Sequence, residues 1–174
     1  RVLFRSASLA KFYLENDSNY KPIAFTVNEK FITKSVHENL PIIPYEELKI
    51  HLNRVEFKLF APLQNNHLRE KIYHEAKDAG YDFISYISSK CTRFSDIGEN
   101  CFILEDNTIQ PFVKIANNVI LWSGNHIGHH SEIHESSFIS SHVVVSGRCV
   151  VEKLSWIGVN ATLKDNIKIA EGCF

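Results

Sequence analysis

Residues 127–145 read IGHHSEIHESSFISSHVVV, and an aliphatic residue returns every six positions, at Ile127, Ile133, Ile139 and Val145. The same period runs through thirteen consecutive units between residues 97 and 174. An amphipathic helix repeats every 3.6 residues and a half-buried strand every 2, so a period of six fits neither. It is typical of a hexapeptide β-helix, in which short strands wind around a prism and stack coil on coil. If three hexads form one coil, each residue lies above the one that stands three hexads earlier.

Most fifth places of the hexads are small or compact and none has a long charged side chain, so the first and fifth places are expected to point into the prism. Three of the four cysteines occupy fifth places, at Cys101, Cys149 and Cys173. No two cysteines are separated by three hexads, so we expect core thiols in a reducing compartment such as the cytoplasm, and no disulfides.

The composition indicates an ordinary globular protein, with 44% hydrophobic and 22% charged residues. Residues 1–90 carry 13 basic and 11 acidic side chains, and residues 91–174 carry 6 and 9. Neither part has the basic excess that nucleic-acid binding requires. No apolar run approaches the roughly 18 residues of a membrane helix, so we expect no membrane insertion. The chain starts without methionine and ends on a hexad without a cap, which we interpret as truncation at both ends.

Residues 1–89 lack the period of six and alternate short apolar strands with helical stretches. The predicted strands are Val2–Phe4, Ile23–Val27, Glu56–Phe60 and Phe83–Ile87. The predicted helices follow Ser6 or Ser8, Pro44, and Asn65 or Asn66, the last one closed by Gly80. This alternation favours a small Rossmann-like parallel sheet with flanking helices. We therefore predict an α/β front domain over residues 1–89 and a left-handed β-helix, C-terminally truncated, over residues 90–174.

The ligand of such a front domain would lie at the carboxyl ends of the strands. Ser6 and Ser8 follow the first predicted strand and could hold an anion, although helix capping also explains them. Asn28 follows the second strand, where a ribose or base is often recognised, and a plain turn is the alternative. The turn after the first strand has no glycine, so a glycine-rich phosphate cradle is absent.

Five of the nine histidines fall within residues 126–142, and none occupies a first or fifth place. They are His126, His129, His130, His134 and His142. These side chains should therefore project outward from the prism. Neutral imidazoles near pH 7 suit either proton abstraction or metal ligation.

Two chemistries compete for these histidines. In the first, a histidine is the general base of acyl transfer from a thioester, and backbone N–H groups stabilise the oxyanion. In the second, zinc is held as in the γ-class carbonic anhydrases, which share this solenoid. That class also needs a histidine about two coils upstream, and residues 90–125 contain none. We therefore expect no metal.

The chain resembles the bacterial hexapeptide sugar acyltransferases of the NeuD/PglD kind, which include sialic acid O-acetyltransferases. The resemblance rests on residues 24–28 (AFTVN), on residues 41–48, on residues 123–131 (SGNHIGHHS) and on residues 139–147 (ISSHVVVSG). It implies a homotrimer with active sites between neighbouring prisms, acetyl-CoA as co-substrate and a nucleotide-linked amino sugar or sialic-acid-type sugar as acceptor.

The resemblance also implies roles for individual residues. His129, at the third place of its hexad, matches the catalytic base, and His130 stands where better-known members have an orienting glutamate. Glu132 or Glu135 could take over that orienting role. A second histidine on the coenzyme side would fall at Phe138, with His142 as the nearest substitute.

Gly147 stands three hexads after His129 and so one coil above it, where it is expected, with backbone amides, to leave room for the thioester. Asn125 and His126, at the start of the histidine-rich motif, are expected to contact the substrate together with Ser6, Ser8 and Asn28. The sequence thus predicts an acetyl-CoA-dependent sugar acyltransferase. The alternatives are a non-catalytic trimeric sugar-binding or scaffold protein and the zinc enzyme.

Overall fold

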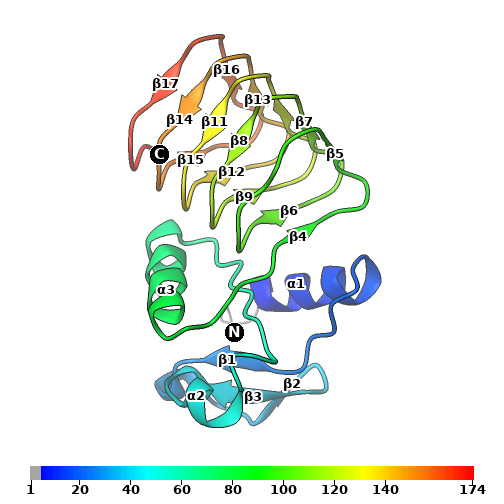
Figure 1. Cartoon of the computed structure of the whole chain (residues 1–174), viewed down its shortest axis with the longest axis vertical. Coiled ribbons are helices and arrows are strands. Elements are labelled where there is room, and N and C mark those ends of the chain that lie inside the picture. The colour runs from blue at the N-terminus through cyan, green and yellow to red at the C-terminus, as the bar shows by residue number, and fades with distance from the viewer. Residues whose placement is uncertain (1–4) are drawn as a thin grey trace.

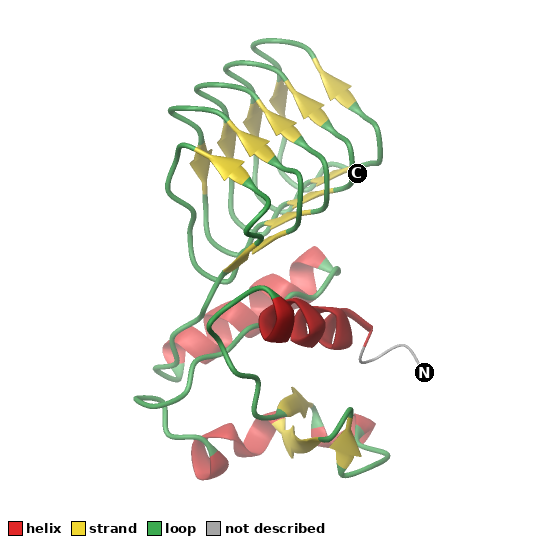
Figure 2. Cartoon of the chain, turned by 90° about the vertical axis from the view of Figure 1, so that its right-hand side faces the viewer, coloured by secondary structure: helices red, strands yellow, loops and turns green. Residues whose placement is uncertain are grey.

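The computed structural model describes residues 5–174 as two parts joined by several contacts. A solenoid of short strands forms one end of the molecule, and a three-stranded sheet with α2 forms the other (Figure 1). The helices α1 (Arg5–Asn16) and α3 (Asn66–Asp78) lie between them in both views (Figure 2).

The solenoid has three parallel sheets, one on each side of the prism. Sheet 1 contains β4 (Tyr86–Ile87), β6 (Phe102–Ile103), β9 (Ile120–Leu121), β12 (Phe138–Ile139) and β15 (Trp156–Ile157). Sheet 2 contains β5 (Thr92–Arg93), β7 (Thr108–Ile109), β10 (His126–Ile127), β13 (Val144–Val145) and β16 (Thr162–Leu163). Sheet 3 contains β8 (Lys114–Ile115), β11 (Glu132–Ile133), β14 (Val150–Val151) and β17 (Lys168–Ile169).

The strand register confirms three hexads in each coil. Ile127 pairs with Ile109 below it and with Val145 above it, and each partner stands three hexads away along the chain. The aliphatic first places meet inside the prism, where Ile109, Ile127 and Val145 have no exposed surface. Burial of this continuous aliphatic column is the main stabilising contribution to the solenoid. The predicted fold class, an α/β front region followed by a left-handed parallel β-helix, is confirmed.

Each corner of the prism turns through a residue with a left-handed backbone. This residue is the fourth place of every hexad, with φ between 51° and 78° from Asn100 to Gly172. Asparagine, aspartate and glycine tolerate this conformation best. They fill just over half of the fourth places, and the remaining ones are Phe112, His130, Ser136, His142, Arg148 and Leu154.

The first coil is shorter than the others and begins earlier than the hexad pattern indicates. Ile87 pairs with Ile103, and Arg93 pairs with Ile109, so both offsets fall short of three full hexads. The strand predicted at Phe83–Ile87 therefore does not complete the front sheet, because β4 is the first strand of the solenoid. Phe83 itself makes a single parallel bridge to Leu59.

The front sheet is mixed and smaller than predicted. β1 (Phe25–Val27) pairs in parallel with β3 (Leu40–Pro44), and β2 (Val36–His37) pairs with β3 in antiparallel fashion. The remaining short elements are η1 (Glu29–Phe31), η2 (Tyr45–Glu47) and α2 (Leu48–His51). The strand predicted at Glu56–Phe60 is wrong, since this segment contributes only the Leu59 bridge, and Val2–Phe4 lies outside the described residues.

Two helices attach the front part to the solenoid. Ala10 and Leu14 of α1 pack on sheet 1, against Phe102, Ile120 and Phe138. α3 begins at its predicted cap, where the Asn65 side chain accepts a hydrogen bond from the Leu68 N–H. No helix among residues 5–174 has the length and apolar character needed to cross a bilayer.

Arg69 of α3 is completely buried against one corner of the solenoid. Its guanidinium donates to the carbonyl oxygens of Asn118 and Ser136, at 3.0 and 2.7 Å, and so contacts two successive coils. Asn66, one turn earlier on the same face, reaches the next coil at Leu154 O. We call this corner, formed by residues 116–119, 134–137 and 152–155, the covered corner.

Candidate functional site

The candidate site lies at a different corner, formed by residues 110–113, 128–131 and 146–149, which we call the open corner. It connects sheet 2 to sheet 3, and both His129 and His130 are exposed there. The tight stacking of coils explains why a glycine precedes the two histidines. A Cβ atom on Gly128 would lie 2.6 Å from the Ser146 backbone, so only glycine fits at this place.

The two histidines of the open corner are bonded to each other. Their Nδ1 atoms are 3.1 Å apart, and their rings meet edge to face at an interplanar angle of 87°. One Nδ1 must carry a proton and the other a lone pair, because a hydrogen bond needs one donor and one acceptor. Within the described part of the chain, His129 Nε2 has no hydrogen-bond partner. An arrangement with Nδ1–H on His129 leaves its exposed Nε2 ready to accept a proton.

The position of the His129 ring depends on its neighbours in the coils below and above. The backbone N–H of His129 donates to Gln110 Oε1 at 2.8 Å. The ring lies over Gly147, where a Cβ atom would come within 2.8 Å of His129 Cε1. Gly147 therefore makes room for the imidazole itself. Its N–H donates to Asp165 Oδ1 at 2.7 Å and is already engaged.

The other three histidines lie elsewhere on the prism. His126 is half-buried on β10 and faces outward from sheet 2. His142 is exposed at the corner between sheets 1 and 2, and its ring covers Gly124, where a Cβ would lie 2.5 Å from His142 Nδ1. His134 lies at the covered corner. The run of histidines in the sequence is thus divided among three corners and one sheet.

Glu132 contacts His134 and not the His129–His130 pair. Glu132 Oε2 lies 3.2 Å from His134 Nε2, and Glu152 Oε2 lies 2.8 Å from His134 Nδ1. Lys114 also pairs with Glu132 at 2.7 Å. Hydrogen bonds from Lys114 and His134 lower the pKa of the Glu132 carboxyl. The group that meets the His129 ring is His130, which stands directly after it.

Two predicted ligand contacts are buried in this structure. Asn125 is 1% exposed, and its Oδ1 accepts a hydrogen bond from the Val143 N–H in the next coil, so it belongs to the inner ladder of the prism. Phe138 is 3% exposed beneath α1, where its ring stacks on Trp156 with centroids 4.1 Å apart. Neither side chain is accessible to a ligand here.

The predicted contacts of the front part are separated from one another. Ser6 and Ser8 lie inside α1 and do not cap it, and Ser8 Oγ lies 2.7 Å from His37 Nε2. Asn28 donates its amide to Glu46 Oε1 at 3.0 Å, which lowers the pKa of the Glu46 carboxyl. Asn28 also lines a pocket of about 430 Å³ together with Tyr45 and Lys71.

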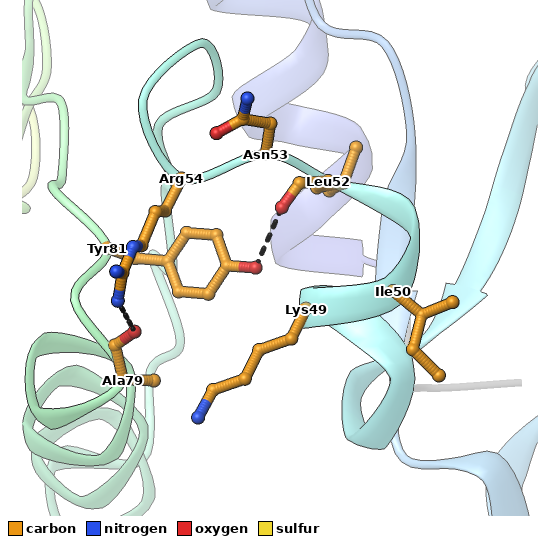
Figure 3. A pocket seen from close by; sticks show the side chains of 7 residues that line it. All are labelled: Lys49, Ile50, Leu52, Asn53, Arg54, Ala79 and Tyr81. Carbon is orange, nitrogen blue, oxygen red and sulfur yellow. Dashed lines mark hydrogen bonds between the residues drawn. The ribbon is translucent and has the colours of Figure 1, made fainter.

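A second pocket, of about 390 Å³, adjoins the first and shares Lys49 and Tyr81 with it. Lys49 and Arg54 reach the space beside the Tyr81 ring from α2 and from the loop that follows it (Figure 3). None of its lining residues carries a carboxylate. This pocket was not predicted from the sequence, because its residues come from segments without a motif.

Two further residues of the open corner were not predicted from the sequence: Gln110, which contacts His129, and Phe112, which contacts His130. Phe112 stands three hexads before His130, so the register of the coils was the signal that could have found it.

Across residues 5–174, no three His, Cys, Asp or Glu side chains come together as a metal site.

The chain is similar to known transferases in both sequence and structure. Residues 94–129 match the family described as bacterial transferase hexapeptide (six repeats). The acetyltransferase domain of PglB from Neisseria gonorrhoeae, solved with acetyl coenzyme A, superposes with a TM-score of 0.81 at 20% identity. That match covers 96% of this chain and 78% of the other.

Two further solved structures have the same architecture. WeeI from Acinetobacter baumannii has a TM-score of 0.78 at 16% identity, covering 97% of this chain and 82% of that one. Perosamine N-acetyltransferase from Caulobacter crescentus, solved with CoA and GDP-perosamine, has a TM-score of 0.58 at 14% identity, covering 78% and 74%. The chain therefore carries a bacterial transferase hexapeptide repeat and shares its fold with these acetyltransferases.

Proposed function

We propose that this protein is an acetyl-CoA-dependent acyltransferase that acetylates an amino or hydroxyl group of a nucleotide-linked bacterial surface sugar, with His129 as general base. The observation that carries the proposal is the geometry of the open corner. His129 is exposed, its Nδ1 contacts His130, and no described group bonds to its Nε2. The similar structures solved with acetyl coenzyme A, CoA and GDP-perosamine support the class of substrates.

The proposed reaction uses the two nitrogens of His129 differently. Nε2 accepts the proton of a neutral amine or hydroxyl while that group attacks the thioester carbonyl carbon. The C–S bond then breaks, the acetyl group stays on the acceptor, and the proton passes to the departing thiolate to give CoA. His130 Nδ1 accepts from His129 Nδ1–H and stabilises the imidazolium that forms between these steps.

The nucleotide part of the acceptor is proposed to contact the front part of the molecule. Asn28, Tyr45 and Lys71 line one pocket there, and Lys49 extends from it into the carboxylate-free pocket beside Arg54. Titration calorimetry with nucleoside diphosphates measures this contact. Loss of binding in Lys49→Ala together with Arg54→Ala supports it, and unchanged binding in the double variant contradicts it.

A homotrimer is part of the same proposal. The outward side chains of sheet 2 are uncharged, in contrast with Lys114, Glu132 and Lys168 on sheet 3. The outward residues of sheet 2 are Thr92, Thr108, His126, Val144 and Thr162. An uncharged, open sheet face suits contact with a second copy of the chain. Light scattering of wild type and Val144→Glu tests this, and a Val144→Glu protein of unchanged mass would contradict it.

The activity is tested by measuring CoA release from acetyl-CoA with a panel of nucleotide-linked amino sugars and sialic-acid-type sugars. Wild type is expected to release CoA with at least one acceptor. His129→Ala is expected to lower kcat by roughly 10² to 10⁴-fold, because general-base catalysis contributes about that much. No release with any acceptor would contradict acyl transfer, and unchanged turnover of His129→Ala would contradict the assigned base.

A further inference from the structure

Phe112 occupies a backbone position that disfavours it. It is the fourth place of its hexad and has φ 67°, in the left-handed region, where bulky side chains are uncommon. Its side chain is also 71% exposed, so burial does not offset this cost. At the preceding corner of the same coil the equivalent residue is Asp106, with φ 60° and a side chain suited to the turn. An exposed aromatic residue in a strained turn calls for a different explanation.

The Phe112 ring lies against His130, one coil above it. The two ring centroids are 4.7 Å apart and the rings are inclined by 34°, which is a tilted stacking contact. His130 in turn meets the His129 ring edge to face, with centroids 5.2 Å apart. Phe112 therefore supports one face of the imidazole whose Nδ1 lies 3.1 Å from His129 Nδ1.

In the proposed arrangement His129 donates and His130 accepts, so the orientation of His130 affects which nitrogen of His129 carries the proton. A neutral imidazole has one N–H and one lone pair, and the hydrogen bond of one nitrogen fixes the state of the other. If the His130 ring turns away, His129 Nδ1–H loses its acceptor. His129 can then carry its proton on Nε2, and in that tautomer Nε2 has no lone pair with which to accept a proton from a substrate.

We infer that Phe112 is a positioning residue for the base: its ring holds His130 in the orientation that keeps His129 in the Nδ1–H tautomer. An aromatic face also stabilises a nearby cation, so it favours the sharing of positive charge between the two imidazoles. The inference rests on the proposed function for its catalytic meaning, but the tautomer can be measured without any substrate.

The test is the ¹⁵N NMR spectrum of the His129 and His130 side chains at about pH 8.5, where ordinary imidazoles are neutral. Wild type and Phe112→Tyr are expected to show His129 mainly as the Nδ1–H tautomer. Phe112→Asn removes the ring and suits the left-handed turn better, so it should fold at least as stably while shifting His129 toward Nε2–H. Asp106→Asn is the matched control at the same turn position, and its histidine spectrum should equal that of wild type.

Turnover provides the second readout. Phe112→Asn is expected to lower kcat about 3-fold, no more than the loss of His130 itself, with little change in KM for acetyl-CoA. Phe112→Tyr should retain most of the activity. Unchanged tautomers in Phe112→Asn would overturn the inference even if the enzyme acetylates a sugar. Conversely, an altered tautomer in a protein that releases no CoA would support the positioning role and refute the proposed function alone.

Discussion

The open corner and the covered corner of the solenoid have the same backbone conformation but differ in their exposure to solvent. Both turn through a left-handed residue at the fourth place, His130 in one and Ser136 in the other. Ser136 is fully buried and its carbonyl oxygen accepts from Arg69 of α3, whereas His130 is exposed to solvent. The same repeat therefore attaches a helix at one corner and leaves the side chains of another corner exposed, depending on what packs against it.

Substitution of Arg69 at the covered corner is expected to lower stability more than any other change proposed below. Arg69→Leu removes the donor to five carbonyl oxygens, of Leu63, Gln64, Asn118, Ser136 and Ser137. Buried acceptors without partners are costly, so the free energy of unfolding should fall by about 3–5 kcal/mol. Chemical denaturation measures this. Arg54→Leu, an exposed arginine, is the control and should change stability by less than about 0.5 kcal/mol.

Among the residues that the structure describes, the Arg69 guanidinium donates to carbonyl oxygens and to the Asn66 side chain but to no carboxylate, and burial lowers its pKa to about 10. A Leu variant as stable as wild type would show that desolvation of the cation offsets all of its hydrogen bonds. In that case the front part would owe its attachment to the solenoid to Asn66 at the covered corner and to the packing of α1 on sheet 1.

Gly147→Ala tests the position of the His129 ring at the open corner. The added methyl group would lie 2.8 Å from His129 Cε1 and 3.0 Å from Nε2, so it displaces the imidazole. We expect kcat to fall roughly 10-fold or more, because a misplaced base loses alignment with its proton. Gly158→Ala is the control, since no atom lies within 4 Å of its Cβ. Equal turnover of the two alanine variants would rule out a need for this ring position.

His130→Ala separates the function of the open corner from the stability of its turn. Both His130→Ala and the control Asn160→Ala place alanine in a left-handed turn, at φ 61° and 59°, and should cost about 1 kcal/mol of stability. Only His130→Ala removes the proposed acceptor of His129 Nδ1–H, so it should also lower kcat about 3- to 10-fold. Similar kcat values in the two variants would assign His130 a purely structural role.

Mild acid is expected to have the smallest effect on stability. It weakens the ion pairs of sheet 3 and of the covered corner. Hydrogen bonds to Lys114 and Lys168, respectively, lower the pKa values of the Glu132 and Glu152 carboxyls. A carboxyl with a lowered folded-state pKa stabilises the fold above its ordinary pKa. That contribution is lost as the pH falls below about 4 and through the folded-state values.

Thermal unfolding between about pH 6 and pH 3 measures this loss of stability. A Glu132→Gln, Glu152→Gln double variant should show a flatter decline than wild type, since these two groups no longer titrate. An equally steep decline in the double variant would assign acid sensitivity to other carboxyls, such as Asp17. Hydrogen bonds from Ser89 and Tyr86 lower the Asp17 pKa as well.

The sequence predicted the solenoid well because the repeat is local. Every first place from Ile103 to Val151 that was assigned to the interior is buried, and His129 projects outward as its third place requires. The register of three hexads also places Phe112 directly below His130, which it contacts. Periodicity of side-chain direction follows from backbone geometry alone, so it can be derived without knowing the partners of a side chain.

Exposure of the outward places could not be derived in the same way. His126 and Phe138 both occupy sixth places and both face outward, yet His126 is half-buried and Phe138 is 3% exposed. The difference arises because α1 packs on sheet 1 and leaves sheet 2 open. The front part was predicted less well, since its strands are short and their pairing depends on distant segments.

The sequence by itself therefore determined a three-sided prism, its aliphatic interior and a pair of outward histidines, because a strict period of six admits one winding of the chain. Only the tertiary structure decided which corner stays open, that His129 pairs with His130 and not with Glu132, and that Asn125 and Phe138 are inaccessible. These outcomes depend on contacts between segments far apart in sequence, where packing and desolvation outweigh local preference.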